Sequence, residues 1–171
     1  EIDFALERTK ETDFVLIQNE IKNVGYIIER AKKKGLQVAF NAAPINKSVE
    51  DYPLDVLDLL FLNEIEAEHL SGTKGSAEMI RVLSKRFPKT KLIITLGGDG
   101  SIYHYKDETL KQIAIDAGQI VDTTGAGDAF VGTFLAFFAE TGRPREALME
   151  AAKASAKCIS RKGATNLLKN V

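Results

Sequence analysis

Apolar and polar positions alternate in two ways along the chain. Short unbroken apolar runs predict buried strands, and apolar residues at helical spacing predict helices. The predicted strands are residues 13–18, 36–40, 57–62 and 91–96. The predicted helices are residues 2–10, 21–34, 65–70, 77–87, 126–139 and 145–159, with a short one near Leu54. Strands that alternate with helices indicate βαβ units, so we expect an α/β fold with a mostly parallel sheet and helices on both faces.

The segment between residues 97 and 121 has a different pattern. Gly97-Gly98-Asp99-Gly100 predicts a turn into the apolar run 101–105, and Asp107-Glu108 predicts a turn into the run 110–115. We expect these two runs to form an antiparallel addition to the sheet. A strand-like run then leads toward the next helix through Ala114, Ile115, Ile120 and Val121.

The stretch from Asp122 to Phe130 joins that run to the apolar helix through a turn of small residues. The first N–H groups of a helix lack intrahelical partners, and the helix dipole adds positive charge there. Gly125 and Gly127 leave room for a phosphate to approach this backbone. Asp128 would repel the phosphate unless it has another task, and the natural task is to accept a proton from an attacking hydroxyl. The structural alternative is a tight turn whose aspartate caps the helix or faces solvent.

Polar and glycine-rich segments follow the predicted strands. They are Gln18-Asn19-Glu20, Asn41, Asn63-Glu64-Ile65-Glu66, Thr95 to Gly100, and Asp122 to Asp128. Ligands bind parallel sheets at the carboxyl ends of the strands. We therefore expect one edge of the sheet to carry the chemistry.

Composition narrows the class of protein. The 171 residues include 23 Lys and Arg against 24 Asp and Glu, a net charge of -1, which argues against a general nucleic-acid binder. One cysteine, Cys158, excludes an internal disulfide and fits a reducing cytoplasm. The longest apolar run, residues 129–139, is too short to span a bilayer, so no membrane partner is expected.

The stretch 122–130, continued by Val131, Gly132, Phe134 and Leu135, resembles the C-terminal signature of the ribokinase-like (PfkB) carbohydrate kinases. Other segments resemble the family in the same order, most closely its ribokinase branch. They are Gln18-Asn19-Glu20, Asn41-Ala42-Ala43-Pro44, Asn63 to Glu66, Thr95 to Gly100, and Arg161-Lys162-Gly163-Ala164. Four places depart from the family pattern. They are Ala42, where the family has the first proline of an Asn-Pro-Ala-Pro segment, Thr133, Ala152 where the family often has a polar residue near adenine, and Thr165-Asn166-Leu167.

The resemblance implies ATP-dependent phosphorylation of a sugar hydroxyl, with Asp128 as catalytic base and sugar contact. The anion hole would be formed by Gly125, Ala126 and Gly127. The nucleotide contacts would be Asn63, Thr95, Gly97 and Gly100. The remaining implied roles are a sugar contact for Glu20, a water-mediated Mg²⁺ contact for Glu66, and a monovalent-cation (K⁺) site at Asp122, Thr124 and Gly163.

Several of these segments have structural alternatives. Asn63 and Glu66 fit a helix N-cap with a first-turn carboxylate, Gly97 to Gly100 fit a hairpin turn, and Glu20 fits the start of a helix.

A dinucleotide oxidoreductase is disfavoured because the glycine turn comes late and is not Gly-x-Gly-x-x-Gly. His69 and His104 lack metal-ligand spacing. Phe130, Phe134, Phe137 and Phe138 form a stripe that predicts core.

The resemblance also implies that residues 1–171 are the C-terminal, nucleotide-binding part of the fold. The family carries sugar-binding motifs and a lid, often its homodimer contact, ahead of the matching region. We therefore expect this chain to bind nucleotide weakly, to be inactive toward sugar alone, and to have an exposed sheet edge. A non-catalytic nucleotide-binding or structural module is the rival hypothesis.

Overall fold

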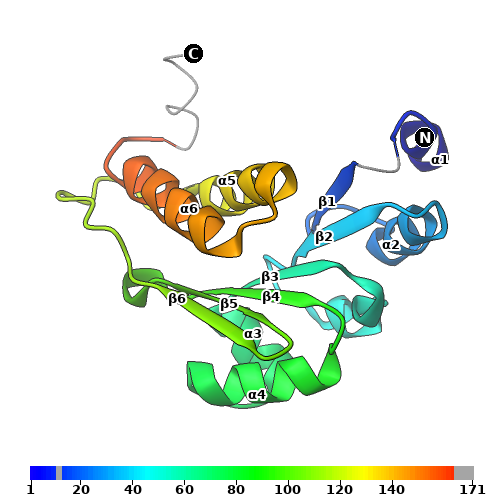
Figure 1. Cartoon of the computed structure of the whole chain (residues 1–171). Helices are drawn as coiled ribbons and strands as arrows, with labels where there is room; N and C mark the ends of the chain where they lie inside the picture. Colours follow the sequence, from blue (N-terminus) through cyan, green and yellow to red (C-terminus); the bar gives the residue numbers. More distant parts are fainter. Residues whose placement is uncertain (11–12, 164–171) are drawn as a thin grey trace. The chain divides into compact units, whose positions relative to one another are not determined.

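The computed structural model describes residues 1–10 and 13–163 (Figure 1). Its helices are α1 (Ile2–Glu7), α2 (Val24–Lys33), α3 (Glu64–Ser71), α4 (Ser76–Arg86), α5 (Ala126–Thr141) and α6 (Pro144–Ile159). Its strands are β1 (Phe14–Gln18), β2 (Gln37–Asn41), β3 (Leu59–Asn63), β4 (Lys91–Thr95), β5 (Ser101–Tyr105) and β6 (Glu108–Gln112). Short 3₁₀ turns occupy Lys47–Asp51, Leu54–Val56 and Gly97–Asp99.

The strands form one six-stranded sheet in the order β1-β2-β3-β4-β5-β6. β1 pairs with β2 in parallel, with Leu16 opposite Ala39, and β2 pairs in parallel with β3. β5 and β6 are neighbours joined by only Lys106 and Asp107, so they run antiparallel as a hairpin (Figure 1). Lys106 has the left-handed φ of 54° that such tight turns use. The predicted α/β fold and its antiparallel addition are confirmed.

Two predicted elements differ from the structure. Residues 113–123 contain no strand, because Asp116 and Gly118 form a turn and Ile113 and Ile120 are 79% and 64% exposed. The predicted helix 21–34 begins only at Val24, because Asn23 has a left-handed φ of 64°. Both differences arise from backbone turns that interrupt an apolar pattern.

The chain divides into two compact units. The first comprises residues 1–94 with the hairpin tip, residues 104–109, and its core lies around β2, β3 and β4. Its largest fully buried side chains include Phe40, Phe61 and Leu60. β1 is an edge strand, and Leu16 on it is 45% exposed.

The second unit comprises residues 95–103 and the chain from Leu110 onward. Helices α5 and α6 pack side by side and are linked by Gly142, which ends α5 at a left-handed φ of 67° (Figure 1). Phe134 is fully buried and stacks on Tyr103 and Phe138, with ring centroids 6.4 Å and 5.6 Å away. Phe137 and Phe138 are only half-buried, so the predicted phenylalanine core is correct for Phe130 and Phe134 alone.

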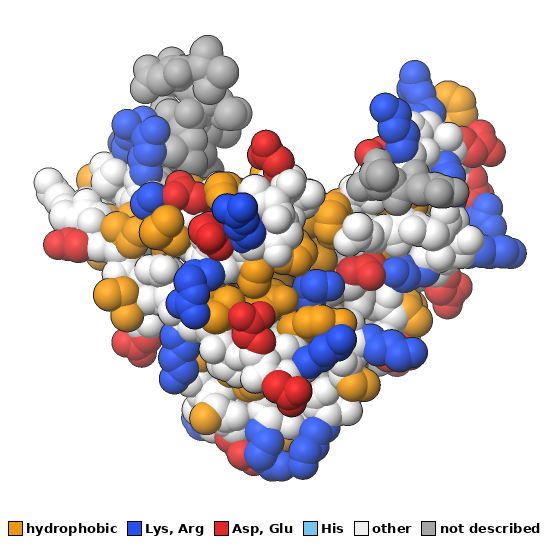
Figure 2. Space-filling view, viewed as in Figure 1, with side chains coloured by type: hydrophobic (Ala, Val, Ile, Leu, Met, Phe, Trp, Pro, Cys, Tyr) orange, Lys and Arg blue, Asp and Glu red, His pale blue; other side chains and the backbone are white. Residues whose placement is uncertain are grey.

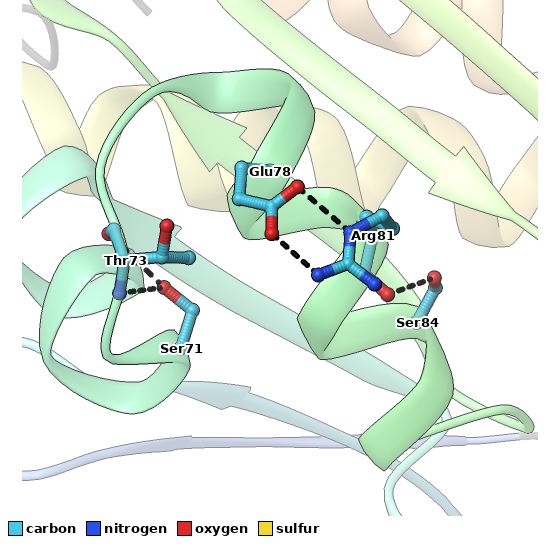
Figure 3. A network of polar contacts seen from close by, with 5 residues as sticks. All are labelled: Ser71, Thr73, Glu78, Arg81 and Ser84. Carbon is cyan, nitrogen blue, oxygen red and sulfur yellow. Dashed lines mark hydrogen bonds and ion pairs between the residues drawn. The ribbon is translucent and has the colours of Figure 1, made fainter.

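The turn between α3 and α4 and the exposed face of α4 carry a group of surface polar contacts (Figure 3). In the turn between α3 and α4, the Ser71 hydroxyl accepts the Thr73 N–H at 3.3 Å, and Arg81 forms an ion pair with Glu78 on α4 (Figure 3). Arg81 therefore holds the pKa of Glu78 below its usual range. Figure 2 shows basic and acidic side chains interspersed over the visible face. This mixture fits the balanced composition.

Candidate functional site

A cleft of about 460 Å³ lies within the second unit. Its walls come from the loop after β4, the segment 114–123, the first turn of α5 and the last turns of α6. The described residues that line it include Thr95, Gly97, Gly100, Ala126 and Gly127. The structure thus brings together five residues that the sequence analysis assigned to nucleotide and phosphate contacts.

The first turn of α5 begins at a glycine with a left-handed backbone conformation. Gly125 is the N-cap with a left-handed φ of 79°, which a residue with a side chain adopts only under strain. The Ala126 N–H donates to the Thr123 carbonyl at 3.2 Å, so this predicted anion-hole donor already has an acceptor. Gly127 and Asp128 follow in the same turn, and both are exposed. The Gly127 N–H lies in the first helical turn, where backbone N–H groups can bind an anion.

Asp122 fixes this turn to the end of α6. Its carboxylate accepts the Thr124 N–H at 2.9 Å and the Gly163 N–H at 3.1 Å. The Val121 N–H donates to the Ile159 carbonyl at 2.8 Å. Hydrogen bonds hold the pKa of Asp122 below its usual range, and those from Thr124 have a larger effect than the one from Gly163. The three residues predicted for a monovalent cation therefore lie together around an ionised carboxylate.

Ala164 and the departing segment Thr165-Asn166-Leu167 lie outside the described residues. Cys158 is buried as expected, and its thiol contacts the Thr124 carbonyl at 3.5 Å.

The loop after β4 is shaped by Gly100. The Leu96 N–H donates to the Gly100 carbonyl at 2.8 Å, which closes the turn. Gly100 has a φ of 94°, and a Cβ there would lie 2.0 Å from the Gln112 carbonyl oxygen. The chain's own backbone therefore requires glycine at this position, in addition to the predicted ligand contact. The adjacent Ser101 lines the cleft, and its buried hydroxyl has no hydrogen-bond partner among the described residues.

Asn63 and Glu66 belong to the first unit and form a capping box at the start of α3. The Glu66 N–H donates to Asn63 Oδ1 at 2.9 Å, and the Asn63 N–H donates to Glu66 Oε2 at 2.8 Å. Glu66 Oε1 also accepts Asn63 Nδ2 at 2.9 Å. Burial of this side chain, which is 2% exposed, raises the pKa of Glu66, and the Asn63 N–H opposes that rise. The N-cap alternative is thus observed, while the nucleotide and Mg²⁺ roles stay predictions.

Glu20 lies in the turn after β1, also in the first unit, and is exposed. Its neighbour Asn19 is buried and donates from Nδ2 to the Pro44 carbonyl at 2.6 Å. This bond ties the end of β1 to the segment after β2. The sugar contact predicted for Glu20 stays a prediction.

Two cleft residues, Asp116 and Ser155, were not singled out from the sequence. Asp116 was hidden inside an apparent strand, although an aspartate two positions before a glycine is a turn signal. Ser155 lies on the cleft side of α6, where no local pattern distinguishes it from a helix surface residue.

No three His, Cys, Asp or Glu side chains cluster as metal ligands within residues 1–10 and 13–163. His69 pairs with Glu50 at 3.3 Å, and His104 Nδ1 lies 2.8 Å from the Thr109 hydroxyl. In the described part of the chain, no helix has the length and apolar character needed to cross a membrane.

Known proteins are similar to this chain in both sequence and fold. The chain is 36% identical over 130 residues to a ribokinase of Lactococcus lactis, covering 75% of this chain and 41% of that protein. It is 29% identical over 169 residues to a deoxyribokinase of Salmonella typhi, covering 95% of this chain and 55% of that protein. A solved Arabidopsis thaliana ribokinase, complexed with ribose and ATP, matches with a TM-score of 0.84 and 30% identity. That match covers 95% of this chain and 54% of the other.

The chain therefore spans about half the length of the curated relatives it matches. The profile described as "pfkB family carbohydrate kinase" matches residues 12–170, which is nearly the whole chain. The glycine turn, the capping box and the cleft all lie within the matched range. The chain belongs to the pfkB family of carbohydrate kinases.

Proposed function

We propose that the native polypeptide containing this chain transfers the γ-phosphate of ATP to a sugar hydroxyl. The observation that carries the proposal is the cleft of the second unit, where Thr95 and Gly97 meet the first turn of α5. A carboxylate, Asp128, lies in that same turn. The Arabidopsis ribokinase whose fold matches this chain was solved with ribose and ATP, which supports both substrate classes.

In the proposed reaction, Asp128 accepts the proton of a sugar hydroxyl. The freed oxygen forms a bond to the γ-phosphorus while the bond from that phosphorus to the leaving oxygen of ADP breaks. The N–H groups of Gly125, Gly127 and Asp128 stabilise the charge that develops on the transferring group. The Ala126 N–H already donates to the Thr123 carbonyl, so it contributes to the anion hole only as a bifurcated donor.

The residues present fit the two cations that the family resemblance implies. Mg²⁺ bound with the nucleotide would neutralise phosphate charge. Both Glu66 oxygens already accept hydrogen bonds from Asn63, which suits contact through water better than direct ligation. Asp122 stays ionised through its N–H donors and would hold K⁺ together with backbone groups of Thr124 and Gly163. Both assignments are proposals.

A non-catalytic nucleotide-binding or structural module is the second candidate. The observation that favours it is length, because the chain spans 41% of one relative and 55% of another. Phosphotransfer measured on the chain alone and on the native polypeptide separates the candidates. Activity in the longer protein alone supports the kinase with an incomplete sugar site here, and inactivity of both with ATP bound supports the module.

Substitution of the proposed base tests the kinase directly. Asp128→Asn in the native polypeptide should lower kcat by about 10²-fold or more, because a positioned general base contributes that much. The Kd for ADP should change little. Glu140→Gln is the matched control, since it removes an exposed carboxylate from the other end of α5. Near-normal turnover by the Asp128→Asn enzyme would overturn the proposed mechanism.

A further inference from the structure

The cleft has one charged side chain among the described residues that line it, Asp116. Much of the surrounding wall is apolar or glycine, with Ile115, Ala117, Ala152 and Ile159 contributing to it. A carboxylate in a site proposed for a polyanion needs a specific partner, because otherwise it only weakens phosphate binding. Asp116 is exposed, so water satisfies its carboxylate in the empty cleft, and a donor on the ligand would take the place of that water.

The structure fixes the Asp116 side chain. Its Oδ1 accepts the Gly118 N–H at 2.8 Å, and Gly118 has a left-handed φ of 68°, so the two residues form an Asx turn. No hydrogen bond or ion pair joins Oδ2 to any residue that the structure describes. One carboxylate oxygen thus holds the turn, and the other keeps its full capacity to accept.

The negative charge of Asp116 indicates that its hydrogen-bond donor belongs to the nucleoside end of a bound nucleotide, away from the phosphates. The phosphates belong at the first turn of α5, where N–H groups and the helix dipole attract anions. A carboxylate would repel them there, whereas nucleosides present N–H and O–H donors on the base and the ribose. The apolar wall next to Asp116 suits the flat face of a base.

We propose that Asp116 is a specificity-determining residue, whose free carboxylate oxygen accepts a hydrogen bond from an N–H or O–H donor of the bound nucleoside. The assignment rests on the proposed nucleotide function of the cleft. The donor is either the exocyclic amine of adenine or a ribose hydroxyl, and ligand analogues distinguish them. Removing either partner of such a charge-assisted bond weakens binding by about tenfold.

Binding measurements on the native polypeptide test this assignment. The probes are ATP, purine riboside triphosphate without the amine, 2′-deoxy-ATP, 3′-deoxy-ATP and inorganic tripolyphosphate. The wild type should bind one of the three analogues about tenfold more weakly than ATP. Asp116→Ala should bind ATP and that same analogue equally. Tripolyphosphate should bind Asp116→Ala at least as tightly as the wild type, because a negative charge has been removed.

Two further variants keep the outcome clear. Asp116→Asn retains an oxygen for the Gly118 N–H, so it preserves the turn while removing the charge, and it should also lose the discrimination. Asp107→Asn makes the same change at the exposed hairpin turn outside the cleft and should behave as wild type. Wild-type discrimination retained in both Asp116 variants, with ATP still bound, overturns this inference alone. Failure of the wild type to bind ATP overturns the proposed function as well.

Discussion

At the scale of the residue, Glu66 shows how burial alters a simple helix cap. Its carboxylate is 2% exposed, and burial raises its pKa above the usual value of 4.5. The folded protein therefore binds this proton more tightly than the unfolded chain does. The resulting stabilisation is fully present below about pH 4.5 and is lost as the pH rises through the higher pKa of the folded state.

Replacement of Glu66 tests that linkage. Glu66→Gln cannot ionise, so the difference in unfolding free energy between wild type and variant should shift in favour of the variant between pH 4 and pH 7. Urea unfolding at several pH values measures this difference. Glu64→Gln is the matched control, because it removes an exposed carboxylate from the same turn of α3. An identical pH trend in both variants would contradict the role of burial.

Single residues also show which contacts can be predicted from the sequence and which cannot. The Asn63-x-x-Glu66 spacing allows a capping box, because the bonds that define it are local. The burial of Glu66 depends on tertiary packing and has no local signal. Asp122 was predicted as a cation ligand from resemblance, but its bond to the Gly163 N–H joins residues far apart in the chain.

At the scale of the element, the loop after β4 depends on one glycine. Gly100→Ala should lower the unfolding free energy by about 2 kcal/mol or more, since it combines an unfavourable φ with overlap against backbone. The overlapping atoms include the Gln112 carbonyl oxygen and the Ala114 nitrogen, at 2.0 Å and 2.8 Å from the added Cβ. Gly98→Ala is the control, because a Cβ there meets nothing within 4 Å. Comparable losses from both substitutions in chemical unfolding would refute this explanation.

Most elements were predictable because their patterns are regular. Helices α5 and α6 and the central strands β2, β3 and β4 follow clear apolar periodicity. The run from Ala114 to Val121 was wrongly predicted to be strand-like because its isoleucines and valine suggested burial, whereas Ile120 and Val121 are exposed. An Asx turn outweighed strand propensity there, and it supplied the cleft residue that the sequence analysis missed.

At the scale of the whole molecule, the predicted site residues come from both units. Every described residue that lines the cleft belongs to the second unit. Glu20, Asn63 and Glu66 belong to the first unit, and the longer relatives have further residues that this chain does not span. Nucleotide binding should therefore be a property of the chain itself, whereas sugar phosphorylation should require the native polypeptide.

Thermal unfolding of residues 1–171 tests this separation. ATP at about 100 times its Kd should stabilise the folded chain by about 2.7 kcal/mol and raise its Tm by about 5–10 °C. Asp128→Asn should show the same shift, because it removes a proton acceptor and keeps the backbone donors of α5. Inorganic tripolyphosphate should give a smaller shift, since it leaves the nucleoside end of the cleft empty. Absence of any shift with millimolar ATP would contradict nucleotide binding by the chain itself.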